Sequence, residues 1–427
     1  MVKSLRIRGK EPLDGNVMIS GSKNAAIPCI AAGILTDEPI ILHNVPAIED
    51  IHTLCEILAA MSVKVSYDDE RTTLRMQCIN PSSDIPPLLS TKMRGATLLM
   101  GTLLARCGEV IFESYGGCPI GERPIDYHLD AFRKLGAKID TKGNQIRVSA
   151  KKLKGTLIEL PFPSVGATEN SILAACCAKG MTTIVNMAVE PEVMNLIEML
   201  GKMGMQYTFD VAKSRIDIEG KTNLQGIRHS IIPDRLEAGT YSVAAAITKS
   251  SITIHPVVEA HISQVIQALR DARGTIELES GMTMRADFSD ICLSPFKIET
   301  GPFPAFPTDL QPQFTSLSTQ AEGRTSIIET VFENRFGHVP ELQKMGAKIQ
   351  ISQRELTIDG PVSLKGAHVT ATDIRGGMAL ILAALCAEGS TTVNGFEIIE
   401  RGYDSLESKL SNLGANIEVI EDEEQHK

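Results

Sequence analysis

The segment KLGAKI, residues 134–139, returns along the chain in variant forms. KMGMQY stands at 202–207, ARGTIEL at 272–278, KMGAKI at 344–349 and NLGANI at 412–417. Their glycines are spaced by about 70 residues, at Gly136, Gly204, Gly274, Gly346 and Gly414. One further step back reaches AAMSVKV at 59–65, a degenerate first copy around Ser62. Six copies therefore fill nearly the whole chain, and the glycine is the signal that ends a helix in each.

Each copy has the same internal order. An Ala-rich apolar helix comes first, as in NAAIPCIAAGIL at 24–35, and a short strand such as TTIVNM at 182–187 follows. A loop with an acidic residue then leads into an amphipathic helix, for example IDYHLDAFRKLGAKI at 125–139, and an alternating strand with its hairpin partner closes the copy. This alternation predicts an α/β fold. The copies could stack as a solenoid, or form two globules of three copies each with a cleft between them.

The composition is typical of a globular protein and argues against several classes. Apolar residues make up 43% of the chain and charged residues 22%, and the net charge of −10 argues against a nucleic-acid partner. The start, MVKSLRIRGK, lacks an apolar signal core, and the longest apolar run, at 378–387, is about half of what a membrane span needs. Nine cysteines in such a chain predict reduced thiols and a cytoplasmic location.

Charged residues recur at equivalent points of the copies. The loop before the second helix carries an acid and then an arginine in three copies, at Glu122-Arg123, Glu333-Asn334-Arg335 and Glu400-Arg401. The acids fit helix caps, whereas a cation near a helix N-terminus is electrostatically disfavoured and needs another explanation. The starts of the first helices carry Lys23 with Asn24, Arg94, Asp309, and Asp373 with Arg375. Because Gly-rich helix starts leave backbone N–H groups free for anions, we expect a polyanionic substrate.

One cysteine lies outside the apolar stretches. Cys118 stands in GGCPIGERPID at 116–126, where glycines and prolines indicate an exposed, mobile loop. The neighbouring Arg123 would favour its thiolate and raise its reactivity. A free surface cysteine without a role is the alternative.

Eight motifs together resemble the UDP-N-acetylglucosamine 1-carboxyvinyltransferase family, enolpyruvyl transferases that perform the first committed step of peptidoglycan synthesis. They are GSKNAA (21–26), GGCPIGERPID (116–126), PSVGATEN (163–170), PDRLEAGTY (233–241), FPTDLQPQF (306–314), VFENRF (331–336), DIRGG (373–377) and RGYDSLESKL (401–410). The resemblance covers essentially the full chain. It implies two inverted α/β-prism domains, each of three βαβαββ repeats around a pseudo-threefold axis, with the active site in the cleft between them. The expected bounds are 1–21 with 234–427 for one domain and 22–233 for the other, which carries the mobile Cys118 loop at about 111–123.

The resemblance also implies the roles of individual residues. Cys118, Asp309, Lys23 and Arg401 would be catalytic: Asp309 as the base on the sugar 3-hydroxyl, and Cys118 as the thiol that protonates or captures phosphoenolpyruvate and assists product release. Phosphoenolpyruvate would be bound by Lys23, Asn24, Arg94, Arg123, Arg335, Arg375 and Arg401. UDP-N-acetylglucosamine would be bound by Asn24, Arg94, Arg123, Pro124, Ile125, Asp126, Ser164, Val165, Gly166, Asp309 and Val331. No metal, cofactor, membrane or obligate protein partner is implied, only the two small-molecule substrates.

Two positions depart from the family pattern. Phe162 stands where some members have a lysine that contacts the diphosphate, and Ala305 stands where glycine is common, close to the turn that holds Asp309. Cysteine at 118 predicts alkylation by the epoxide fosfomycin. Two alternatives stay open: the related transferase that acts on shikimate 3-phosphate, and a weakly catalytic paralogue that binds the UDP-sugar and regulates wall synthesis.

Overall fold

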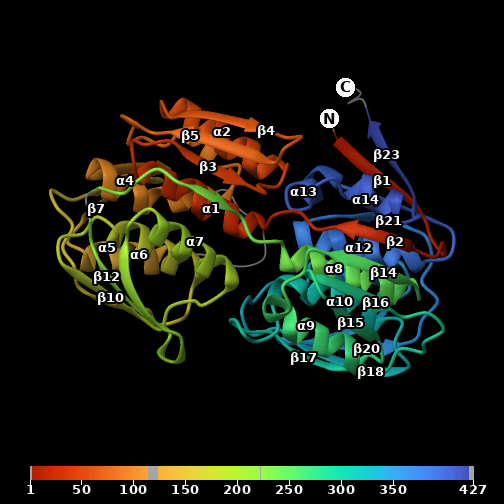
Figure 1. Ribbon diagram of the computed structural model, residues 1–427. Coiled ribbons are helices and arrows are strands. Elements are labelled where there is room, and N and C mark those ends of the chain that lie inside the picture. Colours follow the sequence, from red (N-terminus) through yellow and green to blue (C-terminus); the bar gives the residue numbers. More distant parts are fainter. Residues whose placement is uncertain (1, 114–123, 222, 423–427) are drawn as a thin grey trace. The chain divides into compact units, whose positions relative to one another are not determined.

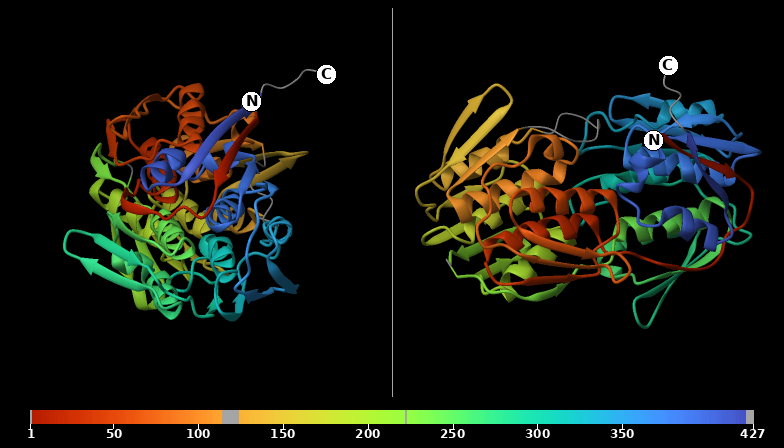
Figure 2. Two further views of the ribbon diagram at one scale, coloured as in Figure 1. Left: turned by 90° about the vertical axis from the view of Figure 1, so that its right-hand side faces the viewer. Right: turned by 90° about the horizontal axis from the view of Figure 1, so that it is seen from above.

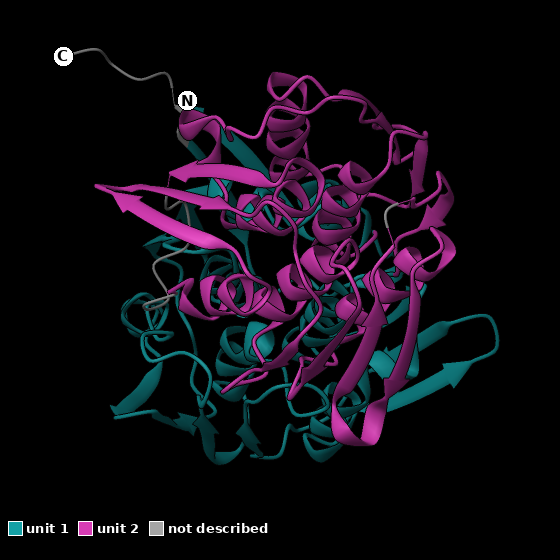
Figure 3. Ribbon diagram, turned by 90° about the vertical axis from the view of Figure 1, so that its left-hand side faces the viewer, with its two compact units in different colours: residues 1–20, 118–122, 233–427 teal, residues 21–117, 123–232 magenta. Residues whose placement is uncertain are grey.

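The chain folds into two compact units, drawn in two colours in Figure 3. The computed structural model describes residues 2–113, 124–221 and 223–422. Among these, unit 1 comprises 2–20 and 233–422, and unit 2 comprises 21–113 and 124–232. The N-terminal segment therefore shares a unit with the second half of the chain.

Unit 2 contains three sheets, with strand orders β13-β3-β5-β4, β6-β8-β7 and β11-β12-β10-β9. Its strands are β3 (Ile40–His43), β4 (Lys64–Asp68), β5 (Thr73–Gln77), β6 (Glu109–Glu113), β7 (Lys138–Lys142), β8 (Gln145–Ser149), β9 (Leu157–Glu159), β10 (Met181–Val185), β11 (Gln206–Asp210), β12 (Arg215–Glu219) and β13 (Arg228–Ser230). Its helices are α1 (Lys23–Ala32), α2 (Glu49–Ala60), α3 (Pro87–Ser90), α4 (Leu99–Cys107), α5 (Asp126–Lys134), α6 (Val165–Ala175) and α7 (Pro191–Lys202), with 3₁₀ turns η1 (Gly33–Leu35), η2 (Arg94–Leu98) and η3 (Val211–Lys213).

Unit 1 likewise contains three sheets, with orders β15-β16-β14-β2, β17-β18-β20-β19 and β21-β22-β1-β23. Its strands are β1 (Val2–Arg8), β2 (Asp14–Met18), β14 (Ser251–His255), β15 (Thr275–Glu279), β16 (Thr283–Asp287), β17 (Lys297–Glu299), β18 (Gly323–Ile328), β19 (Lys348–Ser352), β20 (Glu355–Gly360), β21 (His368–Thr370), β22 (Ser390–Asn394) and β23 (Asn416–Asp422). Its helices are α8 (Arg235–Ile247), α9 (Glu259–Asp271), α10 (Gln311–Ser318), α11 (Val339–Lys344), α12 (Ile374–Cys386), α13 (Phe396–Glu400) and α14 (Leu406–Asn412), with the 3₁₀ turn η4 (Thr308–Leu310).

The first helix of each copy is the core element. In α12, every residue from Arg375 to Cys386 is buried, and in α8 every residue from Leu236 to Ile247 is buried. Helices that are apolar on all sides are stable only inside a core, so the sheets and the second helices must cover them. The views in Figure 2 agree, with strands on the outside of each unit and these helices within it. The polar residues with which α12 and η4 begin therefore lie at an end of the buried helices.

In each unit, strands distant in sequence pair within one sheet. In unit 1, β1 lies between β22 and β23 and pairs antiparallel with both, so the first and last strands of the described chain run side by side (Figure 1). β2 pairs parallel with β14, while β13 pairs parallel with β3 in unit 2. The prediction of an α/β fold built from βαβαββ copies, three to a unit, is confirmed, and the solenoid is excluded.

The left-handed residue just past the second helix of a copy confirms the repeat, but in the fourth copy its position differs from the prediction. Gly136, with φ of 97°, adopts the left-handed conformation expected just past a helix, and Ser62 in the degenerate copy does the same with φ of 67°. In the fourth copy the left-handed residue is Arg273, with φ of 75°, and not Gly274. Gly274 is needed for space, because a Cβ there would lie 2.1 Å from the Phe288 ring. The sequence alignment of this copy was therefore wrong by one residue.

No helix in the described part of the chain has the length and apolar character needed to cross a membrane.

Candidate functional site

Asp309, Arg335 and Arg375 meet in unit 1. Asp309 lies in η4 at the start of α10, and its Oδ1 accepts a hydrogen bond from Nη2 of Arg335 at 2.7 Å. Its Oδ2 forms an ion pair with Nε of Arg375 at 3.4 Å. The two arginine side chains are only 3% and 6% exposed, whereas Asp309 is 29% exposed. Three predicted site residues, from the starts of two core helices and from one loop, thus form one cluster. Asp309 is its solvent-accessible member.

Arg335 is held by a chain of hydrogen bonds that ends on a buried acid. Its Nη1 donates to Oγ1 of Thr308 at 3.1 Å, and this hydroxyl donates to Oε2 of Glu329 at 2.8 Å. Oε1 of Glu329 accepts from the backbone N–H groups of Val331 and Phe332 at 2.8 and 3.0 Å. Glu329 is fully buried, so it fixes both the guanidinium and the backbone at Val331, a predicted sugar contact. Sequence analysis missed this residue, although an acid directly after an apolar strand was a usable signal.

His338, buried beside Arg335, was also missed. Burial and then the Arg335 charge lower the pKa of its imidazole from 6.5 to about 3. The ring is therefore neutral at pH 7. It adds no charge to the cluster.

Arg375 lies at the start of α12, where the helix dipole disfavours a cation. The N-cap Asp373 accepts the backbone N–H groups of Arg375 and Gly376, both at 2.9 Å. The guanidinium carbon lies 5.3 Å from the ring centroid of Tyr403. Its Nη1 is buried and has no hydrogen-bond partner among the described residues. A buried donor left unpaired costs about 1–3 kcal/mol, more when charged, so this atom is suited to receive an anion.

Arg401 also belongs to unit 1, and it is half-buried. It caps the C-terminal end of the short helix α13, where the dipole favours a cation. The expectation that this arginine is disfavoured by a helix N-terminus was therefore wrong.

Lys23 is the first residue of α1 in unit 2 and is already paired. Its Nζ lies 2.9 Å from Oδ2 of Asp50, at the start of α2, and the side chains are 11% and 8% exposed. The half-buried Asn24 follows it in the same helix turn. Arg94, also half-buried, begins η2, which packs on α1 so closely that a Cβ on Gly95 would lie 2.9 Å from Ile27. The starts of α1 and η2 thus lie together.

The predicted nucleotide contacts form a second group in unit 2. Ser164 caps α6, and its Oγ accepts the backbone N–H of Ala167 at 3.4 Å. Gly166 in the first turn lies against the ring of His128 from α5, which a Cβ would approach to 3.2 Å. Pro124, Ile125 and Asp126 form the start of α5, the helix that carries His128, and Val165 is the first residue of α6. Exposed Pro124 and Asp126 flank the buried Ile125.

Cys118 and Arg123 lie outside the described residues.

The two departures from the family pattern are both at the surface. Phe162 is 38% exposed just before α6. Ala305 is exposed in a turn closed by the hydrogen bond from Gly301 N–H to the Phe306 carbonyl at 3.0 Å. The methyl group of Ala305 is accommodated there, and the turn still leads directly into Thr308 and Asp309.

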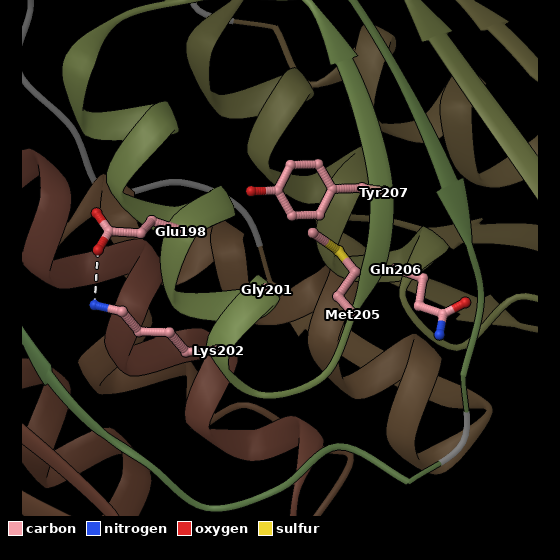
Figure 4. Close-up of a pocket in the computed structure, with 6 residues that line it drawn as sticks. All are labelled: Glu198, Gly201, Lys202, Met205, Gln206 and Tyr207. Atoms are coloured by element: carbon pink, nitrogen blue, oxygen red, sulfur yellow. Dashed lines mark ion pairs between the residues drawn. The ribbon is translucent and has the colours of Figure 1, made fainter.

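A surface depression on unit 2 differs in location and in lining residues from the predicted site (Figure 4). It lies at the end of α7 and is lined by Glu198, Gly201, Lys202, Met205, Gln206 and Tyr207. None of these is a predicted site residue. In the described part of the chain, no three His, Cys, Asp or Glu side chains are grouped to hold a metal ion.

The chain is similar to known proteins over almost its full length. Residues 7–410 match the family model described as EPSP synthase (3-phosphoshikimate 1-carboxyvinyltransferase). A protein of Carboxydothermus hydrogenoformans named UDP-N-acetylglucosamine 1-carboxyvinyltransferase 2 is 44% identical, with 97% of this chain and 99% of the relative covered. UDP-N-acetylglucosamine 1-carboxyvinyltransferase 1 of Staphylococcus aureus is 41% identical, with 97% and 99% covered.

Two solved structures share the fold. The enolpyruvyl transferase NikO from Streptomyces tendae is 25% identical with a TM-score of 0.90, covering 98% of this chain and 99% of that one. The EPSP synthase of Acinetobacter baumannii is 18% identical with a TM-score of 0.76, covering 99% and 100%. The second likeness shows the fold alone.

Proposed function

This chain belongs to the UDP-N-acetylglucosamine 1-carboxyvinyltransferases, and from that premise we propose how its residues move the enolpyruvyl group of phosphoenolpyruvate onto the 3-hydroxyl of UDP-N-acetylglucosamine. The observation that carries the proposal is the carboxylate of Asp309 held by Arg335 and Arg375. The reaction needs a base for the hydroxyl proton and fixed cations for the carboxylate and phosphate of phosphoenolpyruvate. This cluster supplies both within one unit.

The reaction is an addition followed by an elimination. A proton added to the methylene carbon of phosphoenolpyruvate makes its C2 electrophilic. The sugar 3-oxygen attacks C2 while its proton passes to Asp309, which acts as a general base. The resulting tetrahedral ketal carries both the sugar and the phosphate. Loss of phosphate and of one methyl proton restores the double bond as an enol ether. Cys118 is proposed as the thiol that protonates or captures phosphoenolpyruvate.

The cations are proposed to stabilise charge along this path. Lys23, Arg123 and Arg401 hold the phosphate or carboxylate of phosphoenolpyruvate, Arg94, Arg335 and Arg375 complete the anion site, and Asn24 orients the adduct. Fixed donors that need no reorganisation are the strongest electrostatic contribution an enzyme can make. The start of α6, at Ser164, Val165 and Gly166, would bind the diphosphate with the neighbouring Pro124–Asp126 turn, because the N-terminus of a helix attracts anions. Val331, fixed by Glu329, contacts the sugar.

Release of inorganic phosphate with two acceptors tests the function. We expect phosphoenolpyruvate with UDP-N-acetylglucosamine to release phosphate, and shikimate 3-phosphate to release none. The relatives that are 41–44% identical favour the nucleotide sugar, whereas the likeness to EPSP synthase is limited to the fold. Turnover of shikimate 3-phosphate would overturn the proposal. Binding of the UDP-sugar without turnover would instead support the regulatory paralogue.

Inhibition by fosfomycin tests the role of Cys118 separately. We expect fosfomycin to inactivate the enzyme, and Cys118→Asp to retain turnover while losing inactivation. A Cys118→Asp variant that is inactivated as before would contradict the assignment. A cytoplasmic location, roles in cell shape and division through peptidoglycan, the two-domain bounds and the cleft between domains stay predictions.

A further inference from the structure

Tyr403 is a buried phenol whose hydroxyl is part of a directed chain of hydrogen bonds. Thr240 on α8 donates its hydroxyl proton to the Leu236 carbonyl at 2.8 Å, so its oxygen is left to accept. The Tyr403 hydroxyl lies 3.0 Å from this oxygen and therefore donates to it. Nε2 of Gln313 on α10 donates to Tyr403 at 3.0 Å. Two core helices thus fix the ring of Tyr403 through its hydroxyl.

The segment that carries Tyr403 is packed directly on the start of α12. Gly402 lies so close to Ile374, the first residue of this helix, that a Cβ on the glycine would approach its Cγ2 to 2.5 Å. Arg375 is the next residue of the helix, and Arg401 precedes Gly402. The segment 401–403 therefore links Arg401 to Arg375, two of the arginines assigned to phosphoenolpyruvate.

The ring of Tyr403 is one of the contacts that hold the Arg375 guanidinium. The guanidinium carbon lies 5.3 Å from the ring centroid, within the roughly 6 Å at which a cation is attracted to an aromatic face. Another contact is the ion pair with Asp309 at 3.4 Å. The proposed reaction requires Asp309 to take the proton of the sugar hydroxyl, and protonated Asp309 no longer attracts the guanidinium as an anion. The aromatic contact does not change during this step.

We propose that Tyr403 is a positioning residue for the phosphoenolpyruvate site: its hydrogen-bonded ring fixes the Arg375 guanidinium and keeps Nη1 available to an anionic group of the substrate. This inference rests on the proposed function, because it assigns Arg375 to phosphoenolpyruvate. Tyr403 acts through Arg375 and has no contact of its own with the reacting atoms.

The test compares Tyr403→Phe with Tyr241→Phe. Both tyrosines are buried, but the Tyr241 hydroxyl has no hydrogen-bond partner among the described residues, so it is a matched control. We expect Tyr403→Phe, which removes the hydroxyl and both of its hydrogen bonds, to raise KM for phosphoenolpyruvate about tenfold and to leave KM for the UDP-sugar within about twofold. We expect Tyr241→Phe to change neither constant by more than about twofold. Tyr403→Leu, which also removes the ring, should raise KM for phosphoenolpyruvate further.

A double-mutant cycle with Arg375→Ala shows whether Tyr403 acts through this arginine. If it does, Tyr403→Phe adds little to KM for phosphoenolpyruvate once Arg375 is gone. Full additivity of the two changes, or an equal rise of both KM values in Tyr403→Phe, would overturn the inference even if the protein is folded. An unchanged KM for phosphoenolpyruvate in Arg375→Ala alone would instead overturn the assignment of Arg375 within the proposed function.

Discussion

The guanidinium of Arg335 donates from Nη2 to Oδ1 of Asp309 at 2.7 Å, and this arginine is almost completely buried. The carboxylate proposed as the base is therefore bound to a cation that stabilises its charged form. We expect an anionic substrate group that engages Arg335 to compete with Asp309 for the same donors. This pair would then couple substrate binding to activation of the proposed base.

Asp309→Asn should reveal the anion site as a binding site for inorganic phosphate. Removing the charge leaves two buried guanidinium groups without their counter-ion, so we expect a loss of about 1–3 kcal/mol of stability and of about 10²–10⁴-fold in the rate of phosphate release. Phosphate should then raise the melting temperature of the variant more than that of the parent, at matched ionic strength. Asp359→Asn is the control, since Asp359 pairs with Arg324 on the surface. Equal phosphate shifts in all three proteins would contradict the prediction.

Asp50→Asn should destabilise unit 2 strongly. The carboxylate of Asp50 lies 2.9 Å from Nζ of Lys23, and both side chains are nearly buried. Breaking one partner of such a pair leaves a buried charge uncompensated and costs about 3–5 kcal/mol, whereas exposed pairs contribute less than about 1 kcal/mol. Glu198→Gln is the control, because its pair with Lys202 is exposed. Urea unfolding measures both, and similar losses in the two variants would refute the distinction.

His338 should make the protein sensitive to acid. Burial and then the Arg335 charge lower the pKa of the folded imidazole from 6.5 to about 3. Below pH 6.5 the unfolded chain takes up a proton that the folded chain refuses, so stability is lost as the pH falls from 6.5 toward 3, by several kcal/mol. His338→Asn should flatten this part of the stability curve, and the exposed His368→Asn should not. Parallel curves for the parent and His338→Asn would rule the explanation out.

Glu237 should give a pH dependence of opposite sign. Burial raises the pKa of this carboxyl from 4.5 to about 7, against the lowering effect of Lys409, whose Nζ lies 2.6 Å from Oε1. Between pH 4.5 and 7 the folded chain holds a proton that the unfolded chain has released. The contribution of Glu237 to stability is therefore fully present below pH 4.5 and is lost as the pH rises through about 7, by about 3 kcal/mol in total.

Glu237→Gln separates this effect from that of His338. The amide cannot titrate, so we expect the free energy of unfolding of the parent, relative to that of Glu237→Gln, to fall as the pH rises from 4.5 to 7 in chemical unfolding at successive pH values. Glu418→Gln, at an exposed strand position, should differ from the parent by the same amount at every pH. A difference between the parent and Glu237→Gln that does not change with pH would show that Glu237 does not titrate in this range.

The sequence predicted the repeat well because the signals that end a helix are local. A left-handed residue after the second helix depends on neighbouring backbone alone, and Gly136 and even Ser62 follow the pattern. The one misalignment, at Arg273 and Gly274, has a tertiary cause. Contact with the Phe288 ring fixes the glycine one position later, and the sequence carries no local sign of that contact.

The positioning residues were missed for a similar reason. Glu329 follows an apolar strand, which was a usable signal, but its link to Arg335 through Thr308 is set by the fold. Tyr403 takes its partners from other copies, Gln313 on α10 and Thr240 on α8, and no local pattern records them.

By itself, the sequence determined that the chain is a sixfold α/β repeat with cations at equivalent loops, and to which family it belongs. The family resemblance already placed residues 1–21 in one domain with 234–427. Only the tertiary structure decided which strands β1 and β2 pair with, and that Asp309 is bound by Arg335 and Arg375. Helix ends and strand alternation are set by interactions between near neighbours, and every copy repeats them. The pairing of the first and last strands depends on which distant segments pack together, and so does the pairing of buried charges. No short stretch of sequence contains this information.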